Sequence, residues 1–70
     1  MMPLVFANAG EEVTIGKISG NAEVRQHLAD LGFVVGEPIV VVSAMGGNVI
    51  VKVKESRVAI SREMAQKIQF

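Results

Sequence analysis

The stretch Val24–Gly36 constrains the fold of this chain more than any other part of it. Val24, Leu28 and Leu31 recur at the spacing of one face of an α-helix. A run of β-branched residues follows directly, so the helix must be short and must give way to a sheet. Because an isolated helix of this length is only marginally stable in water, its apolar face has to pack against that sheet. The pattern predicts a helix over about residues 22–31.

Both ends of this helix carry specific signals. Asn21 is a good N-cap residue, because its side-chain oxygen can accept a backbone N–H group of the first turn. Gly32 occupies the position where helices commonly end in a left-handed residue, and Phe33 can make the hydrophobic contact that accompanies such an ending. We expect a sharp turn here, and Gly36 marks the corner from which the sheet begins.

The other apolar residues are arranged as short strands. Glu12–Ile18 is predicted to be a strand with a bulge at Gly16, because the alternation of apolar residues changes parity there. Pro38–Ala44 is predicted to be a strand that leads into a hairpin turn at Gly46-Gly47. A return strand, a second turn around Glu55-Ser56 and a further strand follow.

Counting outward from the hairpin glycines assigns the two faces of this sheet. The predicted inner face holds Val40, Val42, Ala44, Val49, Val51 and Val53. The second turn places Val58 opposite Val53. It places Ile60 opposite Val51, again on the inner face. A slip of one residue would exchange the two faces, so the agreement between two turns supports the assignment. The predicted outer face holds Ile39, Val41, Ser43, Ile50, Lys52, Lys54, Arg57, Ala59 and Ser61.

The end of the chain completes the predicted fold. Arg62–Ala65 is expected to form a short helical turn, and Lys67–Phe70 a last strand with Ile68 and Phe70 pointing inward. The prediction is a mainly β domain with about five antiparallel strands and one short helix, curled into a small, partly open barrel. A chain of 70 residues holds only one core, so residues 1–70 form a single domain.

Composition excludes several classes of protein. The chain has no cysteine and a single histidine, which excludes disulfides and argues against a closed structural zinc site. Seven basic and seven acidic residues give no net charge, whereas general nucleic-acid binders are usually basic. No apolar run approaches the roughly 20 residues of a membrane span, and nothing resembles a signal peptide. The expectation is a soluble cytoplasmic domain.

The order and spacing of these segments resemble the FeoA family, small cytoplasmic proteins of bacterial ferrous-iron uptake. The resemblance covers about residues 4–70 and is carried by Leu28–Phe33, Gly36 and the following strand, the glycine-rich hairpin, Val58–Ser61 and Arg62–Ala65. It implies an SH3-like barrel with an added helix. It also implies a partner, FeoB, the membrane iron transporter that carries a cytoplasmic GTPase domain.

The chain carries no catalytic signature. It lacks a nucleophile elbow and a metal-site motif, and Gly46-Gly47 lacks the Lys-Ser/Thr pair that ends a phosphate-binding loop. We therefore expect a protein that binds rather than an enzyme, and one that requires no cofactor.

A weak metal site is one candidate. Glu23, His27 and Asp30 are spaced so that all three can face one side of the predicted helix. One histidine with two carboxylates suits a divalent transition ion such as iron or zinc. The competing interpretation is a solvated helix face with a Glu–His pair. The corresponding alternative function is a metal-binding sensor or carrier.

A docking surface on the sheet is the preferred candidate. Its residues are apolar side chains rimmed by cations, namely Ile39, Val41, Ile50, Lys52, Lys54 and Arg57. An exposed apolar patch with a charged rim is typical of a protein interface. The resulting hypothesis is a non-enzymatic accessory protein of ferrous-iron transport, which docks on a FeoB-type transporter and modulates or assembles it.

Two other interpretations of this surface remain. The curled sheet or the N-terminal segment can cover its apolar residues. A small RNA-binding barrel is a second alternative, although no aromatic residue lies nearby to stack a base. Exposed strand edges also make a homo-oligomer an expected possibility.

Overall fold

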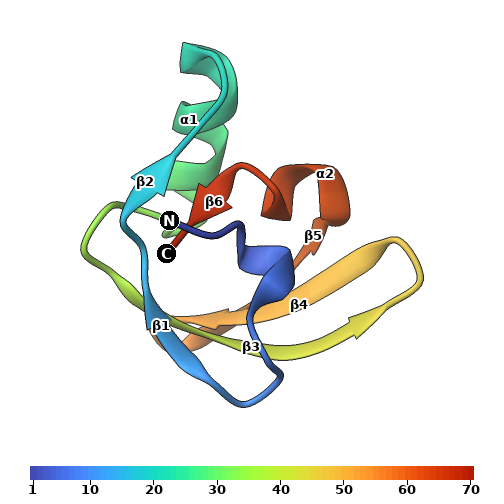
Figure 1. Ribbon diagram of the computed structural model, residues 1–70. Helices are drawn as coiled ribbons and strands as arrows, with labels where there is room; N and C mark the ends of the chain where they lie inside the picture. The colour runs from blue at the N-terminus through green and yellow to red at the C-terminus, as the bar shows by residue number, and fades with distance from the viewer.

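The computed structural model describes residues 1–70, and its strands form two antiparallel sheets (Figure 1). The larger sheet has the order β1-β3-β4-β5, formed by Glu12–Thr14, Pro38–Met45, Asn48–Val53 and Ser56–Ser61. The smaller sheet pairs β2, Lys17–Ile18, with β6, Ile68–Gln69. The helical segments are the 3-10 helix η1 and the helices α1 and α2, at Leu4–Phe6, Ala22–Asp30 and Arg62–Ala65.

The two sheets enclose one core. Figure 1 shows the four-stranded sheet curving beneath the smaller sheet, with η1, α1 and α2 on the same side. The edge strands β1 and β5 do not pair with each other, so the barrel is partly open. The predicted mainly β fold is confirmed, with six strands where about five were expected.

Helix α1 begins and packs as predicted. The Asn21 side chain accepts the Val24 N–H group at 2.8 Å, so the first turn has its cap. Leu28 is fully buried, and Val24 and Leu31 pack against the core beside it. These three side chains form the apolar stripe that the sequence predicts.

The end of α1 is a Schellman motif. The Gly32 N–H group donates to the Ala29 carbonyl and the Phe33 N–H group to the Leu28 carbonyl, both at 2.9 Å. This pattern needs a left-handed residue, and Gly32 has a φ of 106°. Phe33 is fully buried, so the closure of the helix also anchors the largest core side chain.

The predicted strand Glu12–Ile18 is two strands rather than one strand with a bulge. β1 pairs with β3, whereas β2 pairs with β6. The change of partner occurs at Ile15, whose N–H group donates to Glu37 at 3.0 Å, and Gly16, whose N–H group donates to Gln69 at 2.8 Å. The break in the alternation of apolar residues at Gly16 therefore marks the point where the chain passes from the larger sheet to the smaller one.

A β-bulge interrupts the pairing of β3 with β4. Next to the hairpin the pairing is as predicted, with Ala44 opposite Val49, but beyond the bulge Val41 lies opposite Val51. Val42 is the extra residue of the bulge. The Gly10 N–H group donates to the Val41 carbonyl at 2.7 Å, which satisfies a backbone acceptor beside the irregularity.

The bulge corrects the predicted faces of β3. Ile39 and Val41, predicted to be exposed, are in the core at 1% and 4% exposure, whereas Val40 and Val42 are only half-buried. The physical reason is the period of two in a strand: one inserted residue exchanges the faces beyond it. Ile39 and Val41 therefore cannot form part of a surface patch.

The second turn lies one residue earlier than predicted. It consists of Lys54 and Glu55, and it places Val58 opposite Val51. Ile60 accordingly lies opposite Val49. Each partner differs by two residues from the prediction, so the faces of β4 and β5 stay as predicted. Lys54 has a φ of 55°, a conformation that its residue type does not signal.

The two ends of the chain meet beside β6. Met2 and Phe70 exchange backbone hydrogen bonds, both at 2.8 Å. α2 precedes β6, and its first turn is capped by the Ser61 hydroxyl, which accepts the Met64 N–H group at 3.2 Å. The core consists of 13 buried residues, all apolar. None of the helices is long and apolar enough to cross a membrane.

The burial of Val41 generates the first prediction. Val41→Asp places a carboxylate in the core and is expected to cost more than about 4 kcal/mol. A chain of this length has a stability of roughly 4–10 kcal/mol, so the variant should lose a large part of its stability or unfold. Val42→Asp, at the half-buried bulge residue, is the matched control and should cost about 1 kcal/mol. Urea denaturation followed by circular dichroism measures both, and equal stabilities would contradict the observed faces of β3.

The helix ending generates the second prediction. Gly32→Ala should destabilise by more than Gly36→Ala. Both residues have positive φ, 106° and 93°. An alanine at either position should therefore lower the free energy of unfolding by about 1–2 kcal/mol. A Cβ at Gly32 would also lie 3.3 Å from a Val53 methyl group, whereas one at Gly36 meets nothing within 4 Å. Thermal melts of the two variants measure the difference. Equal midpoints would show that the contact with Val53 makes no contribution.

Candidate functional site

The outer face of the larger sheet carries a row of four cross-strand neighbours. Glu12 lies opposite Val40, Val40 opposite Lys52, and Lys52 opposite Arg57. Ile50 lies in the next row. Val40 and Ile50 are half-buried, whereas Lys52 and Arg57 are exposed. We call Val40, Ile50, Lys52 and Arg57 the outer-face cluster.

The cations of this cluster have no acidic partner. Lys52 and Arg57 face each other directly on neighbouring strands, and like charges in that arrangement are destabilising. The only ion pair in the structure joins Lys54 and Glu37, at 3.2 Å. The outer-face cluster therefore presents two adjacent positive charges beside apolar surface.

Lys54, a predicted docking residue, forms an ion pair within the chain. It lies in the turn between β4 and β5, and its ammonium group donates to the Glu37 carboxylate. Its Cε would be 3.7 Å from a Cβ at Gly32, so the side chain passes over the end of α1. The ion pair with Glu37, which lies between α1 and β3, therefore links the β4–β5 turn to the segment that follows the helix.

A shallow hollow of about 240 Å³ adjoins the outer-face cluster. Its lining consists of Glu12, Glu37, Pro38, Ile39, Val40, Lys52 and Lys54. Of the predicted docking residues, Ile50, Lys52 and Arg57 lie on the outer face and Lys54 at its rim, whereas Ile39 and Val41 are in the core. Val40 was missed, because nothing in the sequence reveals the bulge that turns it outward.

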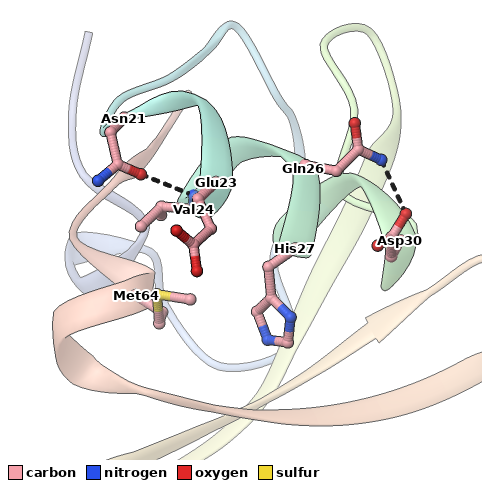
Figure 2. A pocket seen from close by; sticks show the side chains of 7 residues that line it. All are labelled: Asn21, Glu23, Val24, Gln26, His27, Asp30 and Met64. Atoms are coloured by element: carbon pink, nitrogen blue, oxygen red, sulfur yellow. Dashed lines mark hydrogen bonds between the residues drawn. The ribbon is translucent and has the colours of Figure 1, made fainter.

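A second hollow, of about 630 Å³, lies between α1 and α2 (Figure 2). Val24 and Met64 are its apolar residues; the others are Asn21, Glu23, Gln26, His27 and Asp30. Figure 2 shows Asp30 turned toward Gln26, whose amide donates to its carboxylate at 2.9 Å.

The predicted metal ligands share this hollow but do not converge. No three His, Cys, Asp or Glu side chains lie together in an arrangement that could hold a metal ion. The spacing of Glu23, His27 and Asp30 places them along one hollow, but the Asp30 carboxylate is engaged by Gln26. The arrangement is that of a solvated helix face rather than a preformed metal centre.

Comparisons with known proteins agree on one family. A model of the FeoA domain matches residues 2–70. The chain is 40% identical over 68 residues to a Methanocaldococcus jannaschii protein named Fe(2+) transport protein A, covering 97% of this chain and 83% of that protein.

Solved structures show the same fold. The crystal structure of an iron uptake regulatory protein, FeoA, has a TM-score of 0.87 and 30% identity, covering 96% of this chain and 89% of that chain. The solution structure of the FeoA protein from Chlorobium tepidum has a TM-score of 0.88 and 26% identity, covering 97% of this chain and 67% of that chain. The predicted SH3-like fold is confirmed.

The hollow between the helices generates the third prediction. Because the three predicted ligands do not converge, His27→Ala should leave the binding of Zn²⁺ or Fe²⁺ unchanged. Isothermal titration of the wild type and the variant is expected to give the same small heats. A site of micromolar affinity in the wild type that the variant lacks would show that the side chains rearrange to bind metal.

Proposed function

Since this chain belongs to the FeoA domain family, we propose that it is an accessory protein of ferrous-iron transport that acts by binding a partner rather than by catalysis. One relative is named Fe(2+) transport protein A, and another an iron uptake regulatory protein. The proposed partner is a FeoB-type membrane transporter with a cytoplasmic GTPase domain. The proposed location is therefore the cytoplasm, at the membrane only through the partner.

The outer-face cluster carries this proposal. Lys52 and Arg57 face each other, and neither forms an ion pair with a carboxylate of this chain. The repulsion between them lowers the stability of the free domain. A carboxylate on a docked partner would remove the repulsion, while Val40 and Ile50 would lose their remaining contact with water. Apolar residues beside charges that a partner can complement are typical of a non-obligate interface.

Docking acts on the transporter through differential affinity. A bound domain shifts an equilibrium between two states of its partner only when it binds one of them more tightly. In this proposal the two states differ in the nucleotide bound to the GTPase domain or in the assembly of the transporter. No residue of this chain has to reach the nucleotide or the iron.

Charge reversal on the outer-face cluster generates the fourth prediction. The double variant Lys52→Glu/Arg57→Glu should bind the host's FeoB-type transporter at least about tenfold more weakly, because both attractive charges become repulsive. Binding is measured with purified transporter in detergent, immobilised on a sensor surface.

The matched control is Lys17→Glu/Arg25→Glu, which makes the same change in charge at exposed residues of β2 and α1. The control should bind like the wild type. An equal loss in both double variants would mean that the attraction is unspecific and that the outer-face cluster is not the contact. A wild-type chain that fails to bind the transporter would refute the proposed function itself.

A further inference from the structure

The strand β5 is a free edge of the larger sheet. It pairs with β4 along its whole length, and the strand order places nothing beyond it. None of the backbone hydrogen bonds outside the regular ladders involves Arg57, Val58 or Ala59. The middle of β5 therefore has one side on which no protein group satisfies the backbone.

The hairpin register identifies the free backbone groups. Val53 and Ser56 flank a two-residue turn, so they form a hydrogen-bonded pair, and the bonded pairs then recur at every second residue. The backbone groups of Ser56, Val58 and Ile60 consequently point at β4. Those of Arg57 and Ala59 point away from the sheet, where they can pair with another extended chain.

The side chains along this edge leave room for such a chain. Ser56 and Ala59 are small and exposed, and β5 contains neither proline nor a bulge. Arg57 is its one charged residue. Of the devices that usually protect an edge strand, only this charge is present, and it belongs to the outer-face cluster.

We propose that the partner adds an extended, acidic segment to β5 as a further strand of the sheet. Backbone groups of the segment pair with Arg57 and Ala59, and a carboxylate on its outer face lies opposite Arg57. Residues directly opposite on neighbouring strands have Cβ atoms about 5 Å apart, which suits an ion pair. The inference rests on the proposed function and specifies how the outer-face cluster is recognised.

A second copy of this chain fits the same edge less well. A twofold axis through Arg57 or Val58 would bring the two Arg57 side chains opposite or diagonal to each other, which is unfavourable. An axis through Ala59 would direct the β4–β5 turn of the second copy at helix α2. Charge complementarity therefore favours an acidic partner segment.

A proline at Ala59 tests the inference. Ala59→Pro removes the outward N–H group but leaves the bonds of β5 to β4 intact, which is the position in which an edge strand tolerates proline. Ala59→Ser is the matched control, because it keeps the N–H group and a small side chain. We expect Ala59→Pro to bind the detergent-purified FeoB-type transporter about tenfold more weakly than the wild type, because one backbone hydrogen bond is lost, and Ala59→Ser to bind normally.

Hydrogen exchange on the wild type provides a readout that does not depend on the variant folding. The amides of Arg57 and Ala59 should exchange quickly in the free chain and become protected when the transporter is added. Circular dichroism establishes whether Ala59→Pro is folded. If the variant is unfolded, protection of the two amides in the wild type supports the added strand, and unchanged exchange overturns it.

The other outcomes separate the inference from the proposed function. Equal binding by all three chains, with binding lost only in Lys52→Glu/Arg57→Glu, would overturn the added strand and leave the docking function standing. No binding by the wild type would overturn both. A dimer of the free wild-type chain in sedimentation equilibrium, abolished by Ala59→Pro, would assign the edge to a second copy and overturn the acidic partner.

Discussion

The unpaired residue Val42 determines which side chains of β3 face the core and which face water. Because of the bulge, Ile39 and Val41 pack inside, and Val40 comes to lie beside Lys52 on the outer face. The bulge also bends its strand and increases the local twist, which helps a small sheet to curve around a core. The position of the core and the composition of the candidate docking surface thus have one common cause.

The rest of the fold closes that curved sheet only in part. The chain passes from the larger to the smaller sheet at Ile15 and Gly16, and the Gly32–Phe33 ending fixes α1 over the core. These connections join β1 to β2 of the smaller sheet and α1 to β3. They leave β5 without a neighbour, so the open part of the barrel lies next to the cations of the outer-face cluster. The free strand edge and the positive charges therefore lie side by side at β5.

The sequence predicts those elements whose residue types have one physical meaning. Asn21 and Gly32 mark the two ends of α1, and Gly46-Gly47 gives the hairpin and the pairing next to it. The bulge was not predictable, because Ile39–Val42 is a run of apolar β-branched residues without a polar side chain to mark the surface. Lys52 and Arg57 are polar and mark the outer face of their own strands, where they lie as predicted. Val40 carries no such mark. The i, i+4 spacing of Gln26 and Asp30 is itself a signal for their hydrogen bond, which competes with the predicted metal role of Asp30.

The pairing of Met2 with Phe70 has a consequence for how such a domain can be used in evolution and engineering. The chain enters and leaves the fold at one point, as in domains that tolerate insertion into other proteins or circular permutation. Its ends can be joined through a short linker, or extended into neighbouring domains, without passing through the core. A transporter or regulator could therefore acquire this fold as a compact attachment whose free edge stays available.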